Sequence, residues 1–229
     1  MPCAVIWLDY SNPKGLADLL DQNPQIEWVQ LPFAGVDAFS EIIKRPIRFT
    51  SAKGAYREPV AEHALALTLA LMRIIPERVR TQTWGRQFAD SLYDCSVLIF
   101  GGGGISEEML KLLAPFRARV TVIRKNPAPV LGAFQTLGFE QLEAELPKQD
   151  LVILAAALTE ETYQLFDATK FALMKPTAYL VNIARGPMVN TADLVEALNG
   201  QVIAGAAVDV TDPEPLPDGH PLWTAKNII

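Results

Sequence analysis

The chain has 229 residues and a formal net charge of −6, which allows one large or two small domains with a buried core. The acidic balance argues against a general nucleic-acid or anionic-membrane surface, and the longest apolar run, residues 64–72, is too short to span a bilayer. Cys3 and Cys95 form no disulfide framework and no secretion signal is visible, so we expect a cytoplasmic protein. No metal site is predicted.

The start of the chain, residues 1–56, predicts a small α/β unit. Strands are expected over residues 3–8, 26–31 and 47–50, and a helix over residues 15–20. On its own this unit is small for a domain.

A long helix is expected from Pro59, because a proline fits the first helical turn. Residues 60–72 are apolar nearly all round, so the helix should be buried on several sides or against a second subunit. Glu62 and His63 near its start could form a functional pair, although such residues more often cap or flank a helix.

From residue 97 onward, apolar runs alternate with helical patterns. The expected strands cover residues 97–100, 120–123, 151–155, 178–183, 202–210 and 227–229. The expected helices cover residues 105–113, 130–137, 169–174 and 191–198. This alternation predicts an α/β fold with a doubly wound parallel sheet, covered on both faces and binding ligands at the carboxyl ends of its strands.

A glycine-rich turn joins the first of these strands to the following helix. Gly101 and Gly103 occupy the first two glycine positions of a dinucleotide fingerprint, and Gly104 and Ile105 lead into the helix. The third glycine position holds Ser106, which implies slightly wider helix–strand packing. A glycine turn without a ligand is the alternative. The strand–turn–helix context favours a pyrophosphate bound at the helix N-terminus, as in a Rossmann dinucleotide-binding domain.

The residues that follow the strand expected over residues 120–123 indicate which cofactor is bound. An acid about 20 residues past the glycines binds the adenosine ribose hydroxyls in NAD sites, but Arg124 and Lys125 stand here. Two cations offer charged hydrogen bonds to a 2′-phosphate, so NADP is favoured over NAD. The alternative is a solvated pair at a strand end.

Two late segments carry candidate chemistry. Arg185 follows a buried strand and is held by a glycine turn, a suitable place for a bidentate clamp on a carboxylate or carbonyl. Asp209 stands at the end of another strand, and Glu214 lies beyond it in a proline-stiffened loop.

Four motifs together resemble the D-isomer-specific 2-hydroxyacid dehydrogenases, of the glyoxylate/hydroxypyruvate reductase or phosphoglycerate dehydrogenase kind. They are Val-Ala-Glu-His-Ala-Leu at 60–65, Leu-Thr-Glu-Glu-Thr at 158–162, Asn-x-x-Arg-Gly at 182–186 and Asp-Val-x-x-x-Glu-Pro at 209–215. The resemblance implies a smaller, incomplete flavodoxin-like substrate domain at 1–56. It also implies a dinucleotide-binding domain at 57–229, which includes the linking helix, and a homodimer.

The resemblance also implies roles for single residues in catalysis and substrate binding. Arg185 would bind the substrate's carboxylate and carbonyl oxygen, and Glu214 would hydrogen-bond a histidine that exchanges the proton. The backbone near Gly54 and Ala55 would help to bind the substrate carboxylate. This chemistry is sensible, because an alkoxide develops on the carbonyl as hydride arrives and needs a cation and a proton donor.

On the cofactor side, the resemblance implies that Asp209 holds the nicotinamide carboxamide. Thr162 and Ala184, inside two of the motifs, are further candidates for cofactor binding. We therefore predict a hydride-transferring oxidoreductase acting on a small 2-keto or 2-hydroxy acid such as glyoxylate or hydroxypyruvate.

The sequence departs from the family in its histidines. The family's catalytic histidine belongs to a Thr-Pro-His motif just after the strand at 227–229, and neither His63 nor His220 matches it. His220 lies in a loop whose family counterpart is structural. We expect either a fragment of a longer enzyme or a chain that has lost activity. The alternative function is a dinucleotide-binding sensor or corepressor-like protein without turnover.

Overall fold

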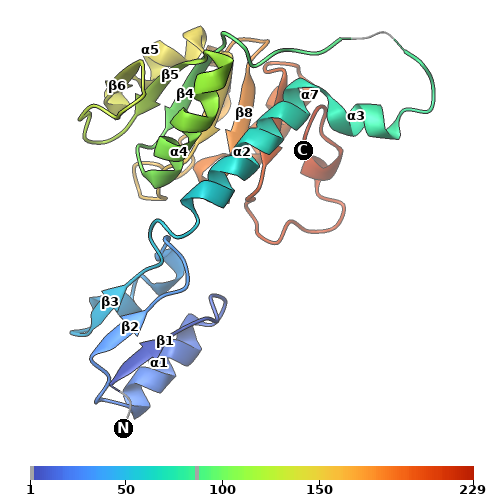
Figure 1. Ribbon diagram of the computed structural model, residues 1–229. Helices are drawn as coiled ribbons and strands as arrows, with labels where there is room; N and C mark the ends of the chain where they lie inside the picture. The colour runs from blue at the N-terminus through green and yellow to red at the C-terminus, as the bar shows by residue number, and fades with distance from the viewer. Residues whose placement is uncertain (1–2, 86–87) are drawn as a thin grey trace. The chain divides into compact units, whose positions relative to one another are not determined.

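The computed structural model describes residues 3–85 and 88–229. The chain divides into two compact units, Met1–Arg57 and Glu58–Ile229 (Figure 1). Each unit is built on a parallel sheet, and the larger unit contains the glycine-rich turn and both late segments. Within the described residues, no helix has the length and apolarity needed to cross a membrane. The roles of the two units in substrate and cofactor binding stay predictions.

The first unit is a three-stranded parallel sheet in the order β1-β2-β3. Its strands, each shorter than predicted, are β1 (Ala4–Ile6), β2 (Trp28–Gln30) and β3 (Arg48–Thr50). Helix α1 (Pro13–Gln22) begins after Asn12, whose side chain accepts a hydrogen bond from the Gly15 amide at 2.8 Å. Leu16 and Leu20 on one face of α1 are buried in the core of this unit.

The second unit contains a six-stranded sheet in the order β6-β5-β4-β7-β8-β9, with every pair parallel. Its strands are β4 (Ser96–Phe100), β5 (Arg119–Ile123), β6 (Gln135–Leu137), β7 (Leu151–Leu154), β8 (Tyr179–Asn182) and β9 (Gly205–Val208). Its helices are α2 (Arg57–Met72), which starts at the boundary between the units, α3 (Ile75–Arg80), α4 (Gly104–Leu113), α5 (Leu142–Glu145), α6 (Ala168–Leu173) and α7 (Thr191–Asn199).

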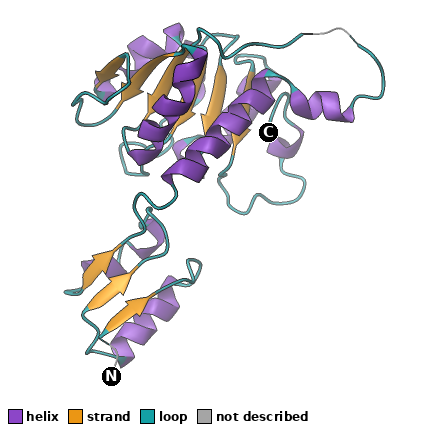
Figure 2. Cartoon of the chain, viewed as in Figure 1, coloured by secondary structure: helices purple, strands orange, loops and turns teal. Residues whose placement is uncertain are grey.

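Both faces of this sheet are covered by helices (Figure 2). Val97 and Ile99 of β4 point into a core shared with α2 and α4. Leu98 and Phe100 alternate with them and join a second core with α5, α6 and α7. The predicted doubly wound α/β fold is confirmed. Its strand order reverses between β4 and β7, which is where ligands bind in such sheets.

The predicted helix over residues 130–137 is wrong. The segment turns at Gly132, which has a φ of +89°, and then forms the edge strand β6 paired with β5. The apolar residues of this segment resemble a helical pattern. A residue with positive φ interrupts a helix, however, and the β-branched Thr136 suits a strand.

The end of the chain also differs from the prediction. Strand β9 is shorter than the expected 202–210, and residues 227–229 form no named strand. They nevertheless continue the sheet through an isolated parallel bridge between Ala206 and Ile228, and Ile229 accepts a hydrogen bond from the Val208 amide at 2.8 Å. Helix α2 starts at Arg57 rather than at Pro59.

The two cysteines are free but differ in exposure. Cys3 is exposed, whereas burial and the nearby carboxylates of Asp150 and Asp90 raise the pKa of the Cys95 thiol to about 11. Because the thiolate is the reactive form and Cys95 is the less exposed thiol, we expect Cys95 to react with an aromatic disulfide reagent at pH 8 at least about tenfold more slowly than Cys3. Cys3→Ser should abolish the fast phase. Equal rates for the two thiols would contradict this prediction.

Candidate functional site

The glycine-rich turn connects β4 to α4 at the carboxyl edge of the sheet. Gly101 has a φ of +119°, and a Cβ there would lie 2.5 Å from the carbonyl oxygen of Ala155, which follows β7. Only glycine satisfies both conditions. Gly103 is the N-cap of α4. Because it has no side chain that could cap the helix, the first amides of α4 stay available to a ligand at this edge. The turn therefore fits a bound pyrophosphate.

Ser106 takes the place of the third fingerprint glycine. Its side chain is fully buried, and its hydroxyl donates a 2.8 Å hydrogen bond to the carbonyl of Gly101. The serine thus ties the first turn of α4 back to the glycine loop and leaves no buried hydroxyl unpaired.

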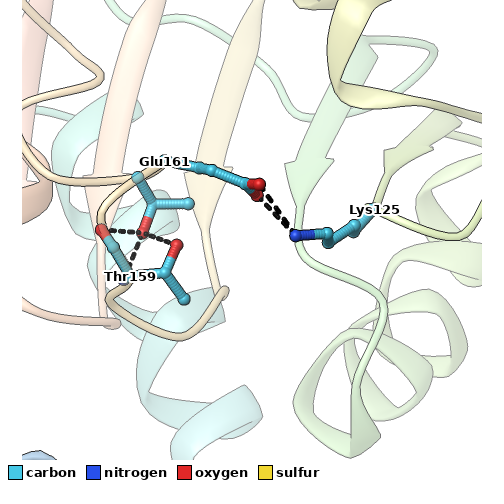
Figure 3. Close-up of polar contacts among 4 residues, drawn as sticks. Lys125, Thr159 and Glu161 are labelled. Atoms are coloured by element: carbon cyan, nitrogen blue, oxygen red, sulfur yellow. Dashed lines mark hydrogen bonds and ion pairs between the residues drawn. The ribbon is translucent and has the colours of Figure 1, made fainter.

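The two cations after β5 have different surroundings. A Cβ at Gly102 would lie 2.7 Å from Cδ and 3.0 Å from Nε of Arg124, so the arginine side chain crosses the glycine loop. Lys125 instead forms an ion pair with Glu161, with Nζ 2.8 Å from Oε1 (Figure 3). Arg124 therefore lies beside the glycine loop and Lys125 lies beside Glu161, and both stay candidates for binding an adenosine 2′-phosphate.

Thr162 organises the loop after β7. It is only 1% exposed, and its hydroxyl accepts a hydrogen bond from the Thr159 amide at 2.8 Å and donates one to the Ala157 carbonyl at 2.9 Å. This loop carries Glu161 (Figure 3). The hydroxyl of Thr162 is thus engaged within the loop, and its part in cofactor binding stays a prediction.

A pocket of about 490 Å³ lies at this edge of the sheet. Phe100 at the end of β4, Phe139 and Leu142 form its apolar wall, while Lys125 and Glu161 stand among its polar residues. The apolar wall of this pocket suits the base of an adenosine moiety.

A buried asparagine shapes the turn that carries Arg185. The side chain of Asn182, 1% exposed, accepts a hydrogen bond from the Ala184 amide and donates one to the Arg185 carbonyl, both at 3.0 Å. The Arg185 guanidinium donates to the Ala184 carbonyl at 2.7 Å. Ala184 is buried and its amide and carbonyl are hydrogen-bonded within the turn, so its part in cofactor binding stays a prediction. The motif alone did not single out Asn182 for this role.

The Arg185 turn lies against the loop that carries Glu214. A Cβ at Gly186 would overlap the backbone carbonyl of Thr211, so this close approach requires a glycine. The amide of Thr211 donates to Oε2 of Glu214 at 3.3 Å. The two late segments predicted to carry the chemistry are therefore in contact through their backbones.

Asp209 has a partner that the sequence did not predict. Its Oδ1 lies 3.1 Å from Nε2 of His63 in α2, 146 residues earlier, and both side chains are about half exposed. Asp209 also donates its amide to the Asn182 carbonyl at 2.9 Å. The sequence favoured a capping or flanking role for His63, and no local signal indicates this contact.

The remaining residues that the sequence singled out are Gly54, Ala55 and His220. The Ala55 amide donates to the Ala52 carbonyl at 3.0 Å within the first unit, and Gly54 has a φ of +88°; their part in binding the substrate carboxylate stays a prediction. His220 accepts a hydrogen bond from the Leu222 amide at 3.1 Å through Nδ1, as a cap. This contact agrees with a structural role for His220.

The chain is similar to several known proteins. The model of the D-isomer specific 2-hydroxyacid dehydrogenase NAD-binding domain matches residues 64–229. The glyoxylate reductase/hydroxypyruvate reductase of Mus musculus is 35% identical, over 94% of this chain and 69% of its own length. The glyoxylate reductase of Thermofilum pendens is 33% identical, over 93% of this chain and 66% of its own length. A crystal structure of a D-isomer specific 2-hydroxyacid dehydrogenase from Xanthobacter autotrophicus Py2, in complex with NADPH and MES, has a TM-score of 0.83 at 27% identity and matches 99% of this chain and 72% of its own.

The doubly wound sheet and its glycine turn define a dinucleotide-binding protein of the Rossmann class. Within that class, the chain belongs to the D-isomer specific 2-hydroxyacid dehydrogenases, as its motifs predicted. It is accordingly a hydride-transferring oxidoreductase that uses NAD(P). Nothing in these comparisons supports the alternative of a sensor without turnover. The chain spans about two thirds of the length of the relatives that it matches.

Proposed function

We propose that this protein reduces a small 2-keto acid such as glyoxylate or hydroxypyruvate, with NADPH as the preferred hydride donor. The observation that carries the proposal is the contact of the Arg185 turn with the Asp209–Glu214 loop, in the same unit as the glycine turn. The names of the similar reductases from Mus musculus and Thermofilum pendens support this substrate class.

Arg185, Glu214 and Asp209 have different roles in the proposed reaction. The bound nicotinamide supplies the hydride, and negative charge develops on the carbonyl oxygen as that hydride arrives. Arg185 would clamp the substrate carboxylate and stabilise this charge, because a guanidinium makes two parallel hydrogen bonds to such groups. Glu214 would stabilise the imidazolium of a proton-donating histidine, as the family resemblance implies. Asp209, beside His63, would accept hydrogen bonds from the carboxamide of the cofactor.

The direct test follows oxidation of NADPH and of NADH with four acids: glyoxylate, hydroxypyruvate, pyruvate and phosphohydroxypyruvate. We expect turnover that is faster with NADPH, and the preferred acid identifies the substrate. Binding of NADPH without turnover of any of the four would contradict the proposed activity of this chain.

The preference for NADPH makes a prediction about Arg124. Its side chain crosses the glycine loop, so Arg124→Ala should weaken NADPH binding about tenfold, the effect of losing a charged hydrogen bond. NADH binding should change little. Fluorescence titration of both nucleotides measures the two affinities. Lys111→Ala, at an exposed lysine of α4 paired with Glu108, is the matched control. Equal affinities for NADPH and NADH in the unaltered protein would contradict the preference.

We further propose a cytoplasmic homodimer built on α2. Leu65, Leu67 and Leu69 of α2 are only partly buried in the single chain, which leaves apolar surface for a second copy. The free Cys3 and Cys95 fit a reducing compartment. A monomer in light scattering at micromolar concentration would contradict the dimer.

A further inference from the structure

The pocket at the carboxyl edge of β4 and β5 contains a lysine whose charge is already matched. Nζ of Lys125 lies 2.8 Å from Oε1 and 2.9 Å from Oε2 of Glu161, so both carboxylate oxygens face the ammonium (Figure 3). Glu161 stands 36 residues further along the chain, in the loop after β7. An anion that approaches Lys125 therefore meets an ammonium that the carboxylate has partly neutralised.

The loop after β7 fixes Glu161 beside the pocket. The backbone of this loop closes on itself through the buried Thr162 hydroxyl and through the amides of Thr162 and Tyr163, which donate to the Thr159 carbonyl at 3.1 and 2.9 Å. Glu161 is thus attached to an ordered turn, and Lys125 follows Arg124 directly after β5. The pair joins the two loops that flank the glycine turn.

We propose that Glu161 competes with the adenosine 2′-phosphate for Lys125 and thereby lowers the preference for NADPH over NADH. The inference rests on the proposed cofactor preference, because it concerns the same site. A 2′-phosphate carries a charge of about −1.5 to −2, so Lys125 must leave Glu161 to bind it, and Glu161 repels it. NADH lacks this phosphate and leaves the ion pair intact. Arg124, beside Gly102 of the glycine loop, would contact the phosphate without breaking this ion pair.

The test compares two ligands that differ only in the 2′-phosphate, adenosine 2′,5′-bisphosphate and 5′-AMP, by titration calorimetry. Glu161→Gln should bind the bisphosphate about three- to fivefold more tightly than the unaltered protein, the range set by the strength of an exposed ion pair. Binding of 5′-AMP should not change. NADPH and NADH should repeat this contrast, and thermal unfolding verifies that the variant is folded.

The Lys125→Met variant decides whether the effect acts through the lysine. In that background, Glu161→Gln should give less than half of its effect on the bisphosphate, because the competed partner is gone. Glu160→Gln, the same charge change one residue earlier on the exposed loop, is the matched control and should have no effect. No gain in Glu161→Gln, an equal gain in Glu160→Gln, or a full gain without Lys125 would overturn the inference.

The two proposals fail in different ways. Equal affinity of the unaltered protein for NADPH and NADH contradicts the proposed preference, but a selective gain in Glu161→Gln would still support the competition. A clear NADPH preference that Arg124→Ala removes, together with no gain in Glu161→Gln, supports the preference and overturns the role of Glu161.

Discussion

Gly186→Ala is expected to lower the free energy of unfolding by about 3 kcal/mol and to remove most activity on the keto acid. The reason is steric. A methyl group at Gly186 overlaps the carbonyl of Thr211, so the Arg185 turn and the Asp209–Glu214 loop must separate. Arg185 precedes Gly186, and the Thr211 amide donates to Glu214, so both predicted catalytic residues move with these backbones.

Chemical denaturation and steady-state kinetics measure the two effects of this substitution. Gly200→Ala at the end of α7 is the matched control, because Gly200 has a φ of −78° and a Cβ there meets the Glu196 carbonyl at 3.0 Å. The control should lose less than about 1 kcal/mol. The glycine turn lies in another part of the sheet edge, so NADPH affinity of folded Gly186→Ala should fall less than kcat/KM. Normal stability with full activity would show that the two loops tolerate separation.

The sequence predicted the strands correctly where their side chains are buried on both faces of the sheet. Residues 97–100 and 151–154 are buried on both faces, and their unbroken apolar runs predicted β4 and β7. Strand β6 lies at the edge and is half-buried, so its residues carry a weaker pattern. The helix predicted over 130–137 was wrong. The spacing of apolar residues does not reveal that Gly132 adopts a positive φ, which interrupts a helix.

The parts of the candidate site that lie within a single short motif could be predicted from the sequence. The glycine turn and the Asn182–Gly186 turn are local, so their positions follow from short stretches of sequence. The ion pair of Lys125 with Glu161 and the contact of His63 with Asp209 join residues 36 and 146 positions apart. Such pairs depend on which loops meet at the sheet edge and on the reach of each side chain, which periodicity and motif spacing do not encode.

Gly103→Ala is expected to weaken the binding of NADPH and NADH alike, by about tenfold, and to lower the free energy of unfolding by less than about 1 kcal/mol, because Gly103 is the N-cap of α4. Gly103 has a φ of −97°, which any residue adopts, and no described atom lies within 4 Å of a Cβ built there. The folded protein therefore has no steric need of glycine at this position. A pyrophosphate at the N-terminus of α4 does need it, because the methyl group would occupy the space through which the phosphate reaches the amides.

Comparison of Gly101→Ala with Gly103→Ala distinguishes an effect on folding from an effect on cofactor binding. At Gly101 the φ of +119° and the Ala155 carbonyl 2.5 Å from a Cβ make glycine necessary to the protein itself. This variant should lose both stability and cofactor binding, as thermal unfolding and fluorescence titration would report. If Gly103→Ala bound both nucleotides with unchanged affinity, the pyrophosphate would not lie against this loop. The position proposed for the whole cofactor would then be wrong, because the adenosine pocket and Arg124 are placed relative to that phosphate.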